Sequence, residues 1–252
     1  MVANDVYDRN FRGTKGNTPS GISYDQFMKM PETQRWQVMD DIIDNSSIQV
    51  PSYLDDSDTT KVLYALGIND KPTVVSDSQL DNMPGTEIYR TVYESGSMPP
   101  PSSDAILDQI RHDDYTQMSG EGGSVHGKAV YFATKFKDSA AYGDKDYSWH
   151  PKTNVMIARA KINPNAKIVS EYNLSTQMTS KGFTSKTQDG DNRISLYAIS
   201  QGIDGWYSGT YTMIVNRKNL TMSDQNRRIS KRNIRGQASN TAKSWSEAAI
   251  AR

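Results

Sequence analysis

The segment from residue 127 to residue 143 constrains the fold of this chain more than any other, because it changes from strand-forming to helix-forming residues within one short stretch. Val130, Tyr131 and Phe132 favour a β-strand. The sequence Asp-Ser-Ala-Ala-Tyr at 138–142 then favours a helical turn that ends at Gly143. Such a strand-to-helix corner can hold two aromatic rings and one hydroxyl around a single flat ligand.

The bulk composition predicts a soluble, cytoplasmic protein of one or two domains. The chain has 252 residues, and 29 Lys and Arg balance 29 Asp and Glu, so the net charge favours neither a nucleic-acid nor a membrane partner. No stretch approaches the roughly 18 apolar residues of a membrane span, and residues 1–5 do not resemble a secretion signal. The absence of Cys and the unpaired spacing of three His predict no structural metal.

The first third of the chain is predicted to be helical. Residues 1–22 lack periodicity and are expected to form a disordered arm, followed by a helical region over 23–84. Apolar side chains at helical spacing predict a helix over 32–44. Asp58 can cap a second helix that Gly67 ends, and Ser76 or Asp77 can start a short turn.

The character of the chain changes after residue 85, and strands then alternate with short helices. Strands are predicted from β-branched and aromatic residues, and helices begin near Ser103 and Ile194. The expected strands cover 86–93, 130–132, 155–162, 166–169, 206–207 and 211–215. This order favours an α+β fold over a regular βαβ alternation. Residues 225–243 contain six Lys or Arg and no acid, which predicts a basic flexible tail over 223–252.

The strand-to-helix segment resembles the nicotinamide-binding signature of the ADP-ribosyltransferase superfamily, in the form found in poly(ADP-ribose) polymerases and diphtheria-type toxins. That signature reads Gly-Lys-Gly-(Ile/Val)-Tyr-Phe-Ala and continues into a Ser-Ala-x-Tyr helix. Tyr131 and Tyr142 stand at the family's spacing, and Ser139 stands at its serine. The resemblance extends over 86–220. It implies a domain at 85–222 with split mixed or antiparallel sheets and short helices, and NAD as the substrate.

The resemblance also implies roles for individual residues. Tyr131 and Tyr142 are expected to bracket the nicotinamide ring, and Ser139 to hydrogen-bond its carboxamide. Arg90 and Thr91 match the first-strand positions that contact NAD, although the family has Gly where this chain has Thr91. The alternative interpretations are a solvated Arg on an edge strand and two half-buried core tyrosines. Val130 and Phe132 are expected to serve packing.

The third element of the family pattern departs from expectation. Catalytic positions would be Arg90, Tyr131 and Tyr211, but the family has Glu where this chain has Tyr211. A phenol near neutral pH does not provide the negative charge of a carboxylate. Asp204 is the nearest substitute, with the alternative that it is a turn residue that caps its own backbone.

The glycine-rich approach to the signature strand also resembles a phosphate-binding loop, from Gly122 to Lys128. That motif requires Ser or Thr at position 129, where this chain has Ala, and a helix rather than a strand afterwards. We interpret the match as coincidence, although Lys128 could still contact a phosphate. His126 in this loop stays open between a surface and a catalytic role.

Two functional hypotheses follow from the resemblance. The first is a mono-ADP-ribosyltransferase, of the type found in phages, that transfers ADP-ribose from NAD to a macromolecular acceptor, most simply a protein. The second is a catalytically inactive member of the fold that binds a viral or host protein through 225–243 as part of a larger assembly. The predicted location is the host cytoplasm, or the virion for a phage protein. A nucleic-acid binder would depend on the basic tail alone, and the zero net charge argues against it.

Overall fold

The structure is a computed structural model that describes residues 18–51, 57–68, 71–95, 103–112, 126–139, 152–186 and 190–230. The side chains of 93–95, 103–104, 152–155, 190–192 and 229–230 lie outside that description. Among the described residues, no helix combines the length and the apolar character needed to cross a membrane.

Three helices precede the sheet. They are α2 (Tyr24–Lys29), α3 (Glu32–Asp44) and α4 (Asp58–Ala65). The bounds of α3 confirm the helix predicted over 32–44, and its buried residues Met39 and Ile42 belong to the periodic set that predicted it. In α4 the cap is Ser57, whose hydroxyl accepts from the Thr60 N–H, so the cap lies one residue before the predicted Asp58.

Eight strands form one mixed sheet in the order β1-β8-β4-β2-β3-β7-β6-β5. The strands are β1 (Thr73–Val75), β2 (Thr86–Ser95), β3 (Val130–Ala133), β4 (Lys152–Ile162), β5 (Ile168–Ser170), β6 (Gly205–Ser208), β7 (Tyr211–Ile214) and β8 (Leu220–Ser230). The outer pairs β1–β8 and β5–β6 are parallel, whereas the inner pairs are antiparallel. The mixture of an eight-stranded sheet with short helices confirms the α+β class.

The sheet consists of two halves. We call β1, β8, β4 and β2 the long-strand half, and β3, β7, β6 and β5 the short-strand half. One pair of register partners, Tyr89 and Ala133, connects them, whereas β2 and β4 share ten pairs within the long-strand half.

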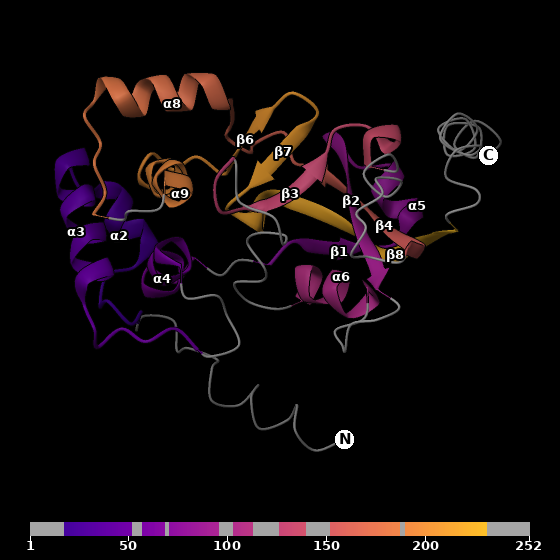
Figure 1. Cartoon of the computed structure of the whole chain (residues 1–252), viewed down its shortest axis with the longest axis horizontal. Helices are drawn as coiled ribbons and strands as arrows, with labels where there is room; N and C mark the ends of the chain where they lie inside the picture. The colour runs from indigo at the N-terminus through magenta and orange to yellow at the C-terminus, as the bar shows by residue number, and fades with distance from the viewer. Residues whose placement is uncertain are drawn as a thin grey trace, which may run out of the picture.

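The remaining helices cover the two halves differently. They are α5 (Asp77–Asp81), α6 (Ser103–His112), α8 (Glu171–Ser180) and α9 (Gly190–Ser200), with a 3-10 turn at Arg217–Asn219. Figure 1 shows α2, α3, α4, α8 and α9 gathered at one end of the molecule, and α5 and α6 beside the long-strand half. One continuous cluster of buried side chains runs from Phe27 in α2 to Met222 in β8, so the N-terminal helices share the core of the sheet.

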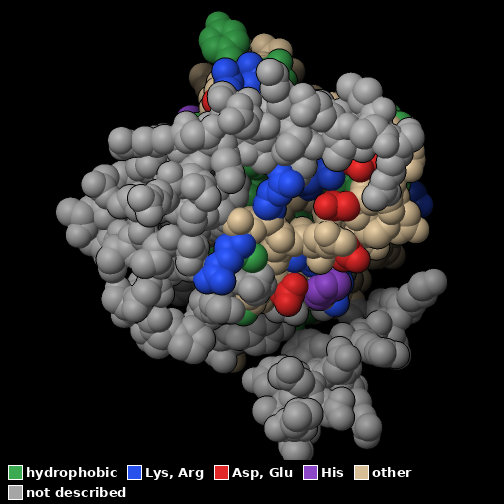
Figure 2. All heavy atoms as spheres, turned by 90° about the vertical axis from the view of Figure 1, so that its right-hand side faces the viewer, with side chains coloured by type: hydrophobic (Ala, Val, Ile, Leu, Met, Phe, Trp, Pro, Cys, Tyr) green, Lys and Arg blue, Asp and Glu red, His purple; other side chains and the backbone are tan. Residues whose placement is uncertain are grey.

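An ion-pair network lies on the long-strand half. Arg159 of β4 contacts Asp81 at 2.5 Å, Glu87 at 2.6 Å and Asp77 at 3.4 Å. This end of the molecule, with α5, β4 and β8, faces the viewer in Figure 2, where basic and acidic side chains are mixed rather than separated by sign. That mixture agrees with the zero net charge of the chain.

Three predicted boundaries require correction. The helical region 23–84 contains β1, because Thr73-Val74-Val75 is β-branched and pairs with β8. The predicted flexible tail begins inside β8, since residues 223–230 continue the ladder with β4. The predicted disordered arm ends earlier than 22, because the Ser20 hydroxyl donates to the Ala65 carbonyl at 2.6 Å.

Candidate functional site

Four of the predicted site residues converge where the two halves of the sheet meet. Arg90 and Thr91 lie on β2, Tyr131 lies on β3, and Ser139 lies in the helical stretch 136–139 that follows β3. Arg90 Nη1 donates to the Tyr131 carbonyl at 2.8 Å, and Thr91 Oγ1 donates to the Ser139 carbonyl at 2.8 Å. These pairs are 41 and 48 residues apart in the chain, so the fold and not local sequence brings them together.

The strand register places two of these residues, Thr91 and Tyr131, on one face of the sheet. Register partners in a sheet share a face and side chains alternate along each strand, so Tyr89, Ala133 and Tyr131 share a face. Thr91, two residues after Tyr89, shares it too. The ring of Phe136 packs against Tyr89 with centroids 5.6 Å apart, which seats the helical stretch 136–139 on this face.

Arg90 starts from the opposite face of β2 and reaches β3 through its guanidinium. It is half-buried, and its bond to a β3 carbonyl connects the two halves beside the Tyr89–Ala133 pair. It is therefore not the solvated edge-strand Arg of the alternative interpretation, because β2 has a neighbouring strand on each side.

Thr91 and Ser139 are bonded to each other. Their hydroxyl oxygens lie 2.5 Å apart, and the two residues are 8% and 2% exposed. The hydroxyl that the resemblance assigns to a carboxamide is thus already paired by the side chain that this chain has in place of Gly. A ligand amide would have to share or replace this bond.

The Tyr131 side chain is hydrogen-bonded through its hydroxyl and is partly exposed. Its phenol donates to the Gly127 carbonyl at 2.6 Å, and the half-buried ring packs against the core cluster. Val130 and Phe132 beside it are each 1% exposed, which confirms their packing role. Tyr142, the predicted second ring, lies outside the described residues.

Tyr211, which stands where the resemblance expects a Glu, lies next to this group. Tyr211 begins β7 and is the register partner of Ala133, while Met213 is the partner of Tyr131. Tyr211 therefore lies on the same face as Tyr131, two residues along the neighbouring strand, and it is partly buried against the core.

Asp204 is a structural residue, but its carboxylate bonds to distant segments and not, as the turn interpretation expects, to its own turn. Its Oδ2 accepts from the Lys167 N–H and from Asn219 Nδ2, each at 2.9 Å, and its carbonyl accepts from the Val215 and Asn216 N–H groups. Asp204 is 6% exposed. With these bonds it joins β5, β6 and the end of β7, and it is not a substitute carboxylate at the surface.

His126 has a partner that the sequence did not reveal. Its Nδ1 lies 2.9 Å and 3.0 Å from the two carboxylate oxygens of Glu171, the first residue of α8. No spacing connects these residues in the sequence, because their contact depends on how α8 packs. The phosphate-loop alternative is wrong, since Val130 begins a strand and not a helix. Among the described residues, no group of three or more His, Asp or Glu could hold a metal ion.

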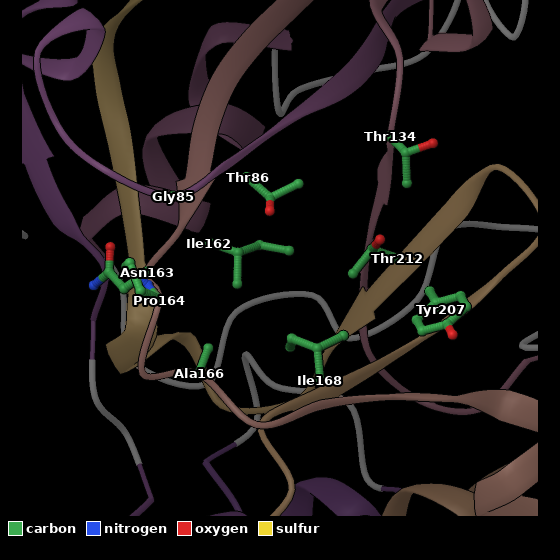
Figure 3. Close-up of a pocket in the computed structure, with 10 residues that line it drawn as sticks. All are labelled: Gly85, Thr86, Thr134, Ile162, Asn163, Pro164, Ala166, Ile168, Tyr207 and Thr212. Atoms are coloured by element: carbon green, nitrogen blue, oxygen red, sulfur yellow. The ribbon is translucent and has the colours of Figure 1, made fainter.

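A groove lined by described residues lies elsewhere, on the Thr212 side of β7. It has a volume of about 480 Å³ and has no charged side chain in its lining. Figure 3 shows it between Thr86 and Ile162 on one side and Thr212 and Ile168 on the other. Thr212 alternates with Met213 and Tyr211, so this groove opens on the face of the short-strand half opposite to Tyr131.

Comparison with known proteins assigns no family to the chain: no family model matches it, and no curated protein or solved structure shows significant similarity to it.

Proposed function

We propose that this protein has an ADP-ribosyltransferase-type fold, binds NAD where the two halves of the sheet meet, and transfers ADP-ribose to a macromolecular acceptor. The observation that carries the proposal is the contact between Thr91 and Ser139. The resemblance assigns Ser139 to the nicotinamide carboxamide and Thr91 to a first-strand position that contacts nicotinamide through its main chain. The two residues lie within hydrogen-bond distance although they are 48 residues apart. Tyr131 lies on the same face as Thr91.

The residues present would act on the nicotinamide end of NAD. The Thr91 main chain and the Ser139 hydroxyl would hold the carboxamide, while the Tyr131 ring would lie flat against the pyridinium. The N-glycosidic bond breaks with its electron pair leaving on nicotinamide, and an acceptor nucleophile then bonds to ribose C1′. Fixing the ring and the ribose in this geometry lowers the barrier mainly through orientation.

Tyr211 limits the rate of this reaction. A carboxylate at its position would stabilise the positive charge that develops on the ribose, and a neutral phenol does so less well. We therefore expect slow transfer of single ADP-ribose units, fastest to acceptors that bring their own carboxylate.

A second candidate is an inactive member of the fold that acts as an interaction protein, in a phage virion or in the host cytoplasm. The bond between Thr91 and Ser139 and the phenol of Tyr211 support it, since both depart from the active pattern. The proposed partner segment 225–243 overlaps β8, because Arg227 and Arg228 lie in that strand. Residues 231–243 are the part of the segment that falls outside the described strand.

Calorimetry with NAD, combined with radiolabelled NAD in a cell lysate, separates these candidates. The wild type should bind NAD and label protein. Ser139→Ala should weaken binding by about tenfold, the equivalent of one net hydrogen bond, and Tyr131→Ala should abolish labelling. Tyr207→Ala is the matched control, because this tyrosine is 48% exposed and lines the groove on the opposite face.

Thr91→Gly gives the decisive comparison. This change removes the side chain that pairs Ser139 and restores the family's residue. Heat of NAD binding in this variant but not in the wild type would favour the inactive candidate, with a site closed by one side chain. No binding in either protein would refute both the NAD site and its resemblance-based residues.

A further inference from the structure

Residues His126 and Gly127, which we call the strap, cross the sheet surface between β3 and β6. The His126 carbonyl accepts from Trp206 Nε1 at 2.8 Å, and the Gly127 carbonyl accepts from the Tyr131 phenol at 2.6 Å. Tyr131 and Trp206 are both register partners of Met213, one on each side of β7. The strap therefore spans β7 and is hydrogen-bonded at each side.

Gly127 lets the strap lie close to the sheet and to α9. Its φ is +98°, a conformation that side chains rarely adopt. A Cβ there would lie 2.5 Å from Ile194 Cγ2 and 2.8 Å from Trp206 Cζ2. There is thus no room for a side chain at Gly127. Ile194 and Trp206 pack against the strap and oppose its movement towards the sheet.

The His126 side chain connects the strap to α8. Its Nδ1 is almost equally distant from both oxygens of Glu171, and the two side chains are 31% and 22% exposed. A partly exposed pair of this kind contributes little to global stability, about 1 kcal/mol or less. The pair is therefore expected to affect the position of the strap and not the global stability of the fold.

We propose that His126 and Glu171 form a positioning pair that fixes the strap and thereby the orientation of the Tyr131 ring, and that this orientation sets the affinity for the nicotinamide end of NAD. The link is direct, because the phenol of Tyr131 is bonded to the residue next to His126. The affinity part of this inference rests on the proposed function, whereas the ring-orientation part does not.

Fluorine NMR of the full chain with 3-fluorotyrosine placed only at position 131 tests the orientation without any ligand. Spectra are recorded below the pH at which the fluorinated phenol ionises. Glu171→Ala removes the acceptor and should shift or broaden the resonance, and His126→Gln should do the same from the other side of the pair. Glu171→Gln keeps a carbonyl oxygen and should restore most of the wild-type signal.

The matched control is Glu32→Ala. Glu32 bonds to Lys181 at the opposite end of α8 and to Gln201. The substitution therefore removes a carboxylate contact at the same helix without altering a contact of the strap. It should leave the resonance of residue 131 unchanged. An unchanged resonance in both Glu171→Ala and His126→Gln would overturn the proposal.

NAD calorimetry on the same variants tests the affinity. Glu171→Ala should raise the Kd for NAD by about threefold to tenfold, with Glu171→Gln close to wild type. A shifted resonance with an unchanged Kd would refute the effect on affinity. A shifted resonance in a protein whose wild type does not bind NAD would refute the proposed function and leave the positioning pair intact.

Discussion

The two halves of the sheet differ in how they are held together. The long-strand half has β2, β4 and β8 of 10, 11 and 11 residues, with a buried arginine and an ion-pair network across it. The short-strand half has strands of only three or four residues and depends on specific contacts, such as those of Asp204 and the strap. We therefore expect the long ladders to stabilise the long-strand half, whereas most of the candidate site lies in the short-strand half or where the two halves meet.

The largest expected effect comes from breaking the long-strand half at Arg111. This side chain is 2% exposed and joins α6 to β8, with Nε donating to the Ser223 carbonyl at 2.7 Å and Nη2 to the Gln225 carbonyl at 3.2 Å. Arg111→Leu removes these hydrogen bonds between α6 and β8, one of which is buried, so the free energy of unfolding should fall by about 3 to 5 kcal/mol.

Asp108→Asn is the control for this change, because its carboxylate also contacts Arg111 but is 66% exposed. It should alter the free energy of unfolding by roughly 0.5 kcal/mol or less. Urea denaturation of the two variants measures both numbers. Similar losses in the two would mean that Arg111 acts only as a surface charge.

The next effect tests the short-strand half at Gly127. Gly127→Ala combines an unfavourable φ with overlap against Ile194 and Trp206, and should reduce the free energy of unfolding by about 2 to 4 kcal/mol. Gly209→Ala has a φ of +57° but open space around its Cβ, so about 1 kcal/mol is expected.

Amide exchange locates the damage. In Gly127→Ala, the amides of β3, β6 and β7 should exchange faster before those of β2 and β4 do. Uniform acceleration over both halves would show that the sheet opens as one unit, and the contrast between the halves would then be wrong.

The smallest effect is a dependence on alkaline pH through Tyr24 of α2, whose phenol donates to the Ile199 carbonyl of α9 at 3.3 Å. Burial, assisted by the nearby Asp204 carboxylate, raises the pKa of Tyr24 from 10.0 to about 12. The folded state thus favours the neutral phenol. The contribution of Tyr24 to the free energy of unfolding is complete below pH 10 and is lost as the pH rises towards 12. At pH 11 the free energy of unfolding is lower by about 1.4 kcal/mol.

Tyr24→Phe cannot ionise at this position and provides the reference. The difference in unfolding free energy between wild type and variant, measured at pH 9 and pH 11, should change by that amount in favour of the variant. A constant difference would show that Tyr24 ionises equally well in the folded and unfolded chain.

Local patterns predicted those elements whose stability is visible in their own residues. The helix over 32–44 followed from apolar spacing, and β2 followed from its β-branched and aromatic residues. The strand β8 was missed because Arg227 and Arg228 suggested a solvated tail, whereas the ladder with β4 determines its conformation. Pairing with a distant strand leaves little trace in the sequence of either partner.

The sequence predicted which of the described residues lie together at the candidate site, but it did not predict the bonds between them, and Tyr142 lies outside the described residues. The motif around Tyr131 pointed to Ser139, and the first strand pointed to Arg90 and Thr91. The bond between Thr91 and Ser139 and the contact of His126 with Glu171 depend on side-chain packing across elements. Only the folded arrangement of β2, the stretch 136–139 and α8 could reveal them.

The interior position of β8 has a consequence for synthesis of the chain. This strand occupies the slot between β1 and β4, yet it is the last of the eight to leave the ribosome. Until then β4 presents an unpaired edge, which is the kind of surface that invites aggregation. The long-strand half has the longest ladders once the chain has folded. During synthesis it is therefore the part that we expect to depend most on chaperones.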